Sequence, residues 1–130
     1  MTEKVNKTPT HVVLVDDDPI FTSLVQKVAR QERIQITIFS TVESAYRELP
    51  RLKFDVALFD YYIGDSTGMQ LSQFIQQTGK KIPIILISYF GEIEKRQFPS
   101  FIDKAINKSA GPYSILTAVR KVLTQSGSSR

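Results

Sequence analysis

The amino-acid sequence contains no cysteine, and His11 is the only histidine among its 130 residues. The lack of cysteine excludes disulfides, thiolate zinc sites and cysteine nucleophiles. A single histidine excludes metal sites and catalysis that need two imidazole groups. The sequence also lacks an apolar run of membrane-spanning length, and residues 1–10 lack the apolar stretch of a signal peptide. We therefore expect a cytoplasmic protein with no membrane partner.

Hydrophobic residues make up 42% of the chain, which is enough to build a core, and 130 residues suit one domain. Residues 1–10 predict a flexible N-terminal tail, residues 11–125 the folded domain, and residues 126–130 a flexible C-terminal tail. The formal net charge is +4. Because the lysines and arginines are scattered rather than clustered, we do not expect the protein to bind nucleic acid.

Five short segments have the length and composition of β-strands. They are residues 11–15, 34–39, 54–59, 82–87 and, less distinctly, 104–107. The unbroken apolar runs at 11–15, 54–59 and 82–87 are typical of strands that are buried on both faces of a parallel sheet. Segment 34–39 alternates apolar and polar residues, which predicts an edge strand with one face in water.

Helical patterns, with apolar residues three or four positions apart, lie between these segments. Helices are predicted to begin at Pro19, near Thr41 and near Thr67, and a last one contains residues 115–123. Pro99 lies where a helix should connect the last two strands, so we expect that helix to be shortened, irregular or replaced by a loop. The alternation of strands and helices predicts a three-layer α/β/α sandwich.

Polar residues that can carry chemistry follow four of the five predicted strands. Asp16 and Asp17 follow the first strand, Asp60 the third, Ser88 the fourth and Lys108 the fifth. In open parallel sheets, ligands bind beyond the carboxyl ends of the strands. If the first, third and fourth strands are neighbours, their polar residues meet in one crevice, and Lys108 joins them from the far side.

Three carboxylates in one crevice repel each other unless a cation lies between them. Oxygen ligands of this kind suit Mg²⁺. A lysine and a hydroxyl nearby would complete a site for a phosphoryl group, since they stabilise its oxygens by charge and by hydrogen bonding. A carboxylate can also attack phosphorus and form an aspartyl phosphate. The residue types therefore indicate a magnesium-dependent phosphoryl site.

Helix capping is the simpler interpretation of the aspartates. Asp18 is followed by Pro19, a pair that is typical of a helix start, so we interpret Asp18 as a cap rather than a ligand. Taken alone, Asp16 and Asp17 fit either role equally well. The presence of Asp60 and Lys108 at other strand ends favours the metal interpretation.

The blocks VLVDDDP, DVALFDYYIGDSTGMQL and IPIILIS, followed by Lys108, resemble those of bacterial response-regulator receiver domains, of which the chemotaxis regulators are examples. The resemblance covers about residues 11–124. It implies a flavodoxin-like fold whose five parallel strands, counted along the chain, lie in the order 2-1-3-4-5. It also implies a phosphoprotein of a two-component or phosphorelay system rather than an enzyme, with at most Mg²⁺-dependent self-phosphorylation and autodephosphorylation.

The resemblance assigns roles to individual residues. Asp60 matches the phosphoacceptor, and Asp16 and Asp17 match the acidic pair that binds Mg²⁺ together with it. Tyr62 matches the position whose backbone carbonyl is a further ligand of Mg²⁺. Ser88 matches the hydroxyl that acts as a switch when the domain is phosphorylated. Lys108 matches the lysine that pairs with the phosphoryl oxygens.

The sequence departs from the family pattern near the site. The family commonly has a switching aromatic residue three positions before the lysine, where this chain has Ala105. The residue after the switch hydroxyl is usually small, whereas here it is Tyr89. Tyr89 and Tyr62 stand on either side of the phosphoacceptor, so we expect them to modulate access to it.

Two functions remain open. In the first, a histidine kinase or a histidine phosphotransfer protein phosphorylates Asp60, and the domain switches the surface that binds a downstream protein. In the second, an atypical receiver-like module binds its partner without phosphorylation. The complete set of acidic, hydroxyl and lysine residues favours the first. A flavin-binding enzyme is excluded, because the acidic loop DDDP provides no phosphate cradle. We expect a monomer or a weak dimer.

Overall fold

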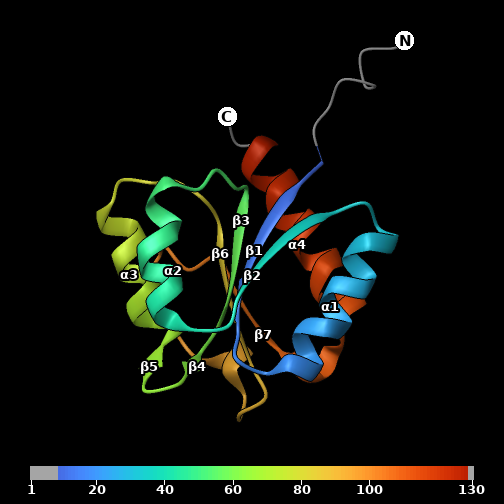
Figure 1. Ribbon diagram of the computed structural model, residues 1–130, viewed down its shortest axis with the longest axis horizontal. Helices are drawn as coiled ribbons and strands as arrows, with labels where there is room; N and C mark the ends of the chain where they lie inside the picture. The colour runs from blue at the N-terminus through green and yellow to red at the C-terminus, as the bar shows by residue number, and fades with distance from the viewer. Residues whose placement is uncertain (1–8, 129–130) are drawn as a thin grey trace.

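The centre of the molecule is a five-stranded parallel sheet (Figure 1). The computed structural model describes residues 9–128. The strands of the sheet are β1 (His11–Val15), β2 (Gln35–Phe39), β3 (Val56–Asp60), β6 (Ile84–Ser88) and β7 (Lys104–Asn107). Their spatial order is β2-β1-β3-β6-β7. This confirms the predicted order 2-1-3-4-5, because β6 and β7 are the fourth and fifth strands of the sheet along the chain.

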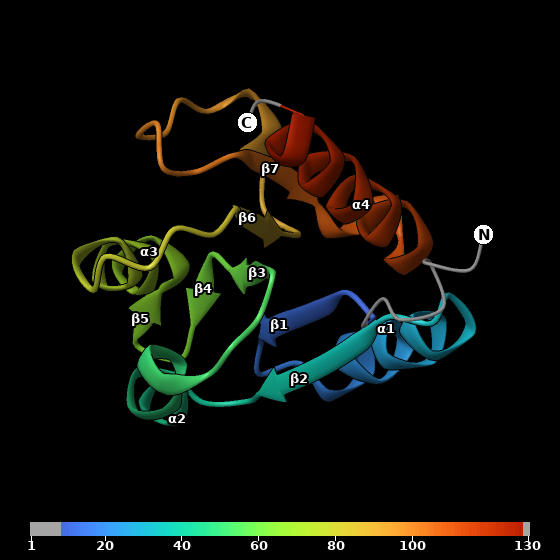
Figure 2. The same cartoon turned by 90° about the horizontal axis from the view of Figure 1, so that it is seen from above.

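Helices cover both faces of the sheet, which confirms the three-layer sandwich (Figure 2). The helices are α1 (Pro19–Gln31), α2 (Val42–Glu48), α3 (Gly68–Gln77) and α4 (Pro112–Ser128), with single 3-10 turns η2 (Leu49–Arg51), η3 (Ile93–Lys95) and η4 (Lys108–Ala110). One apolar core joins α1 and α4 to the sheet, and a second core joins α2 and α3 to its other face. No helix in the described range is long and apolar enough to cross a membrane.

Side-chain caps explain where three of the helices begin. Asp18 Oδ1 accepts hydrogen bonds from Ile20 N at 3.0 Å and Phe21 N at 3.3 Å, which confirms the interpretation of Asp18 as a cap. Thr41 caps α2 in the same way. Thr67 and Gln70 form a reciprocal capping box at the start of α3. This box anchors the first turn of α3 next to the end of β3.

Two strands end one residue later than the sequence predicts. β3 ends at Asp60 and β6 ends at Ser88, so both residues are the last of their strands rather than the first after them. The backbone pairing of β3 with β6 extends to Asp60, opposite Ile87. Asp60 and Ser88 are therefore placed by the sheet itself and not by a mobile loop.

The chain between β6 and β7 forms no fourth α-helix. Its only regular element is the single turn η3, and a proline, Pro99, lies farther along the segment. The helix that the sequence placed here is thus replaced by a loop with one short turn, as the position of Pro99 led us to expect. The structure adds a small antiparallel hairpin, β4 (Tyr62–Ile63) with β5 (Ser66–Thr67), which the sequence analysis did not predict.

The structure describes only part of the two tails that the sequence predicts. Residues 1–8 and 129–130 lie outside the described residues, so most of the predicted N-terminal tail does too. At the other end, α4 continues to Ser128, three residues into the segment 126–130 for which the sequence predicts a tail. The helix thus extends beyond the predicted domain boundary.

Candidate functional site

A buried lysine lies between two carboxylates at the carboxyl end of the sheet. Lys108 Nζ is 2.6 Å from Asp16 Oδ2 and 3.0 Å from Asp60 Oδ2. Asp16 directly follows β1, Asp60 ends β3, and Lys108 directly follows β7. The exposed fractions are 0% for Asp16, 8% for Asp60 and 4% for Lys108. The strand order thus brings together three charges that are far apart in the sequence.

Burial sets the protonation chemistry of this cluster. Burial, and after it the negative charge of Asp16, raise the pKa of Asp60 to about 6, although the ammonium of Lys108 and the Tyr62 N–H act in the opposite direction. Burial by itself would lower the pKa of Lys108. Its hydrogen bonds and ion pairs with Asp16 and Asp60 outweigh that effect and raise its pKa above the ordinary value. Lys108 is therefore a fixed positive charge beside two carboxylates.

Two aromatic rings flank the same ammonium group. Lys108 Nζ lies 4.5 Å from the centroid of the Phe21 ring and 5.2 Å from that of Tyr89. A cation held over the face of an aromatic ring is stabilised by the ring's quadrupole. The two rings also meet edge to face, with centroids 6.3 Å apart. Phe21 is buried and Tyr89 is 54% exposed, so Tyr89 lies on the solvent side of the lysine.

A third carboxylate completes an acidic cluster that can hold a metal ion. One oxygen each of Asp16, Asp17 and Asp60 lies within 4.8 Å of the others. Asp16 Oδ2 is buried and pairs with Lys108 Nζ at 2.6 Å, and it has no further hydrogen-bond partner among the described residues. Three carboxylates with one ammonium leave two negative charges when all are ionised. A divalent cation that prefers oxygen ligands fits this negative charge and the closeness of the three carboxylates.

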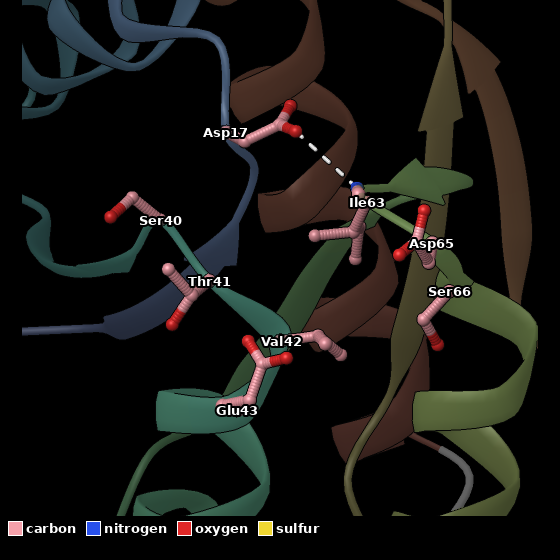
Figure 3. A pocket seen from close by; sticks show the side chains of 9 residues that line it. Asp17, Ser40, Thr41, Val42, Glu43, Ile63, Asp65 and Ser66 are labelled. Atoms are coloured by element: carbon pink, nitrogen blue, oxygen red, sulfur yellow. Dashed lines mark hydrogen bonds between the residues drawn. The ribbon is translucent and has the colours of Figure 1, made fainter.

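Asp17 faces a pocket of about 370 Å³ that lies between the β2–α2 loop and the β4–β5 hairpin (Figure 3). The pocket is lined by Asp17, Ser40, Thr41, Val42, Glu43, Ile63, Gly64, Asp65 and Ser66. Asp17 Oδ2 accepts a hydrogen bond from Gly64 N at 3.3 Å, drawn as the dashed line in Figure 3. This bond links the acidic cluster to the hairpin.

Ser88 is the last residue of β6, and Tyr62 is the first residue of β4. Ser88 is 1% exposed, and its Oγ accepts a hydrogen bond from Phe90 N at 3.0 Å. Tyr62 N donates to Asp60 Oδ1 at 3.4 Å. Ala105 stands apart from the cluster: it pairs with Leu86 inside the sheet and packs against the core on the α2 and α3 side.

The sequence analysis missed contributions from Gly68, Phe21 and Phe90. A Cβ atom on Gly68 would lie 2.5 Å from the backbone oxygen of Asp60, so only glycine lets α3 begin this close to the end of β3. Phe21 belongs to the predicted apolar stripe of α1, and nothing in that pattern indicates its contact with Lys108. Phe90 is 67% exposed, and its ring lies 5.3 Å from that of Tyr62, a contact that depends on how the loop after β6 folds.

Comparison with known proteins identifies the family. The family model of the response regulator receiver domain matches residues 12–120. The solved Francisella response regulator 1452 receiver domain superposes with a TM-score of 0.79 at 17% identity, covering 90% of this chain and 98% of that one. The response regulator TrrA from Thermotoga maritima, solved in complex with Mg²⁺-BeF, gives a TM-score of 0.76 at 20% identity, covering 86% and 97%. The chain belongs to the response regulator receiver domain family, a family of signalling domains in two-component systems.

The curated relatives are longer proteins. The transcriptional regulatory protein GlrR of Escherichia coli (strain K12) is 29% identical over 108 residues, which is 78% of this chain and 24% of GlrR. The response regulator protein PilR of Pseudomonas aeruginosa is 28% identical over 82 residues, which is 63% of this chain and 18% of PilR. The chain thus spans about a quarter or less of the length of these relatives.

Proposed function

We propose that Asp60 accepts a phosphoryl group from a phosphohistidine donor in a Mg²⁺-dependent reaction. The observation that carries the proposal is the position of the buried Lys108 ammonium, 3.0 Å from Asp60 Oδ2. Asp60 is the carboxylate that combines this contact with a strand-end position and a small remaining exposure of 8%. A phosphoryl group that is transferred to Asp60 carries negatively charged oxygens. The ammonium of Lys108 is already in place to stabilise that charge.

In the proposed reaction, a carboxylate oxygen of Asp60 attacks the donor phosphorus. The new bond joins that oxygen to phosphorus, the phosphorus–nitrogen bond of the phosphohistidine breaks, and the imidazole leaves with the electron pair. Lys108 stabilises the negative charge on the transferred oxygens. Ser88 Oγ, at the end of the neighbouring strand, is the proposed switch hydroxyl that hydrogen-bonds a phosphoryl oxygen.

Asp16, Asp17 and Asp60 are the proposed carboxylate ligands of Mg²⁺, with the backbone carbonyl of Tyr62 as a further ligand. The net negative charge of the cluster and the short separation of its three carboxylate oxygens, within 4.8 Å of one another, support this set. When bound, Mg²⁺ supplies positive charge that neutralises the phosphoryl oxygens. The pKa of about 6 for Asp60 leaves its carboxylate available at neutral pH.

The biological setting follows from the family. We infer that a histidine kinase or a histidine phosphotransfer protein is the donor, that the domain acts in the cytoplasm, and that phosphorylation alters the binding of a downstream protein. We further infer a monomer or a weak dimer, with residues 11–125 as the signalling unit. Self-phosphorylation and autodephosphorylation are the only reactions that we assign to the domain itself.

Intact mass spectrometry after incubation with acetyl phosphate tests the proposal. With Mg²⁺, the wild-type protein should gain one phosphoryl group, and Asp60→Asn should gain none. Asp65→Asn is the matched control, because it removes an exposed carboxylate from the adjacent β4–β5 hairpin, and it should behave as wild type. A chelator should abolish the modification. If the wild-type protein gains no phosphoryl group even after long incubation, the proposal is wrong, and an interaction module without phosphorylation is the better description.

A further inference from the structure

A closed circuit of contacts joins the buried lysine of the site to the start of α1. Asp16 Oδ1 accepts a hydrogen bond from Asp18 N at 2.9 Å, and Asp18 Oδ1 accepts one from Phe21 N at 3.3 Å. The centroid of the Phe21 ring lies 4.5 Å from Lys108 Nζ, and Lys108 Nζ lies 2.6 Å from Asp16 Oδ2. The loop that carries the aspartates therefore also fixes the ring that contacts the lysine.

The ammonium of Lys108 has contacts beyond its two ion pairs. A lysine ammonium carries three hydrogen-bond donors on a flexible stem. Carboxylate oxygens of Asp16 and Asp60 pair with this ammonium, and the lysine side chain is only 3% exposed, so water has little access to it. The rings of Phe21 and Tyr89 lie against the same group. Aromatic faces thus provide part of the environment that replaces water around the charge.

Phe21 is the nearer of the two rings and the buried one. Its exposed fraction is 2%, against 54% for Tyr89, whose centroid is 5.2 Å from the ammonium. A cation–π contact is weak where water competes for the cation and stronger where both partners are desolvated. Most of the stabilisation of the Lys108 ammonium by aromatic rings therefore comes from Phe21.

Packing alone does not require an aromatic residue at this position of α1. The helix buries Phe21, Val25 and Ala29 in the core that it shares with α4 and the sheet. Apolar side chains of similar volume, such as leucine or methionine, are usually tolerated at such sites. What the ring adds to an aliphatic side chain is the negative face of its π system.

The contact with Phe21 does not involve the oxygen that reacts. When Asp60 takes a phosphoryl group, Lys108 has to exchange its hydrogen bond to Asp60 Oδ2, 3.0 Å long, for one to a phosphoryl oxygen. Its contacts with Phe21 and Asp16 can stay as they are, because neither is part of the reacting carboxylate. A charge that is held in this way needs no reorganisation at the moment of transfer.

We propose that Phe21 is a positioning residue whose π face holds the Lys108 ammonium in place for the phosphoryl group on Asp60. The inference rests on the proposed phosphorylation of Asp60 and deepens it, because it gives a residue of α1 a part in the same site. Phe21 acts through Lys108 and not on the phosphoryl group. Weakening its π face should therefore loosen the ammonium and leave the carboxylates of the metal cluster in place.

Fluorinated phenylalanines at position 21 test the inference, because each added fluorine weakens the π face and changes the shape of the ring little. Amber suppression introduces rings with an increasing number of fluorine atoms. The measured quantity is the affinity for beryllofluoride, an analogue of the phosphoryl group, in calorimetry with saturating Mg²⁺. We expect this affinity to fall with each fluorine, by about tenfold over the series.

The same substitutions at Phe59 are the matched control. Phe59 is a fully buried ring of β3 that packs in the other core, with α2 and α3. Fluorination there should leave the beryllofluoride affinity unchanged. The affinity for Mg²⁺ alone should be unchanged in both series, since the carboxylate ligands are untouched. Phe21→Leu, which fills the site without a π face, should lose as much beryllofluoride affinity as the most fluorinated ring and keep its Mg²⁺ affinity.

The possible outcomes separate this inference from the proposed function. If wild type binds beryllofluoride and gains a phosphoryl group from acetyl phosphate, but the Phe21 series is flat or the Phe59 series falls equally, Phe21 does not position the lysine and the phosphorylation of Asp60 stands. A loss of Mg²⁺ affinity in the Phe21 series would show a general structural role and also overturn the inference. If wild type neither binds beryllofluoride nor gains a phosphoryl group, the proposed function fails, and the inference fails with it.

Discussion

Lys108 balances only part of the negative charge that the fold gathers at the end of the sheet. Its ammonium contacts Asp16 and Asp60, and the carboxylate of Asp17 is instead bonded to a backbone amide of the hairpin. The sequence could predict this grouping, because residues that follow neighbouring parallel strands meet at one edge. It could not predict the contacts of Lys108 with Phe21 and Tyr89, since these depend on how α1 and the loop after β6 pack.

Asp17→Asn should weaken Mg²⁺ binding by at least about tenfold, which corresponds to 1.4 kcal/mol. The variant removes one of three carboxylates whose oxygens lie within 4.8 Å of one another, and it keeps the shape of the side chain. Isothermal titration calorimetry with Mg²⁺ measures the change in affinity. Asp65→Asn is the control, because it removes one negative charge from the neighbouring hairpin without removing a proposed ligand of Mg²⁺. Equal affinity in wild type and Asp17→Asn would contradict the metal assignment.

Asp60→Asn should stabilise the metal-free protein above pH 6. The pKa of Asp60 rises from an ordinary 3.8 to about 6 on folding, so the folded protein binds more protons than the unfolded chain between these values. The free energy of unfolding of wild type therefore falls as pH rises through this window. The free energy of unfolding of Asp60→Asn does not fall in this way. The difference in free energy of unfolding, variant minus wild type, should therefore grow from near zero at about pH 4 to about 2 kcal/mol at about pH 8.

Urea unfolding of both proteins with a chelator present measures this difference at each pH. Asp16 and Lys108 interact with Asp60, so the difference reports the Asp60 carboxylate together with its effect on these two neighbours. A variant that is less stable than wild type at about pH 8 would show that the carboxylate is a structural hydrogen-bond acceptor rather than a source of repulsion.

At the scale of elements, α3 is held unusually close to the end of β3. Gly68 N donates to Tyr61 O at 2.8 Å, and the position leaves no room for a Cβ atom. The sequence predicts the start of this helix near Thr67 but not its distance from Asp60. It also did not predict the β4–β5 hairpin, because strands of two residues produce no periodic pattern.

Gly68→Ala should destabilise the domain by about 1–3 kcal/mol. The added Cβ would meet the backbone oxygen of Asp60 at 2.5 Å and the Cβ of Phe59 at 3.1 Å, and neither neighbour is the flexible end of a side chain. Thermal or urea unfolding measures the loss. Gln73→Ala, an exposed position of the same helix, should stay within about 0.5 kcal/mol of wild type. Equal stabilities of the two variants would refute the close contact.

The segment 91–103, between β6 and β7, should exchange its amide hydrogens faster than α3 does. Its regular structure is limited to η3, and its anchors are a few turn bonds together with the buried Ile93 and Ile102. Amides outside a helix or sheet open at lower free energy. Hydrogen exchange resolved by peptide measures both segments in one experiment. Protection of 91–103 equal to that of α3 would reveal a stable element there.

At the scale of the whole molecule, periodicity was sufficient to predict the three-layer sandwich, because buried parallel strands have a distinct apolar signature. The strand order 2-1-3-4-5 was implied by the resemblance to receiver domains and not by periodicity. Both are confirmed, as is the disruption of the helix expected around Pro99. The ends of elements were less predictable. The helix that was expected to stop before residue 126 continues to Ser128, and β3 and β6 each extend by one residue to include Asp60 and Ser88.

The account as a whole depends on one residue, Asp60, taking the phosphoryl group. Reductive trapping tests this most directly: the protein is phosphorylated with acetyl phosphate and Mg²⁺ and treated with borohydride, which reduces an acyl phosphate to an alcohol. Peptide sequencing by mass spectrometry then finds the modified position. The account predicts homoserine in place of Asp60 and unmodified Asp16, Asp17 and Asp18. Homoserine at one of those three aspartates, or at none of the four, would contradict it.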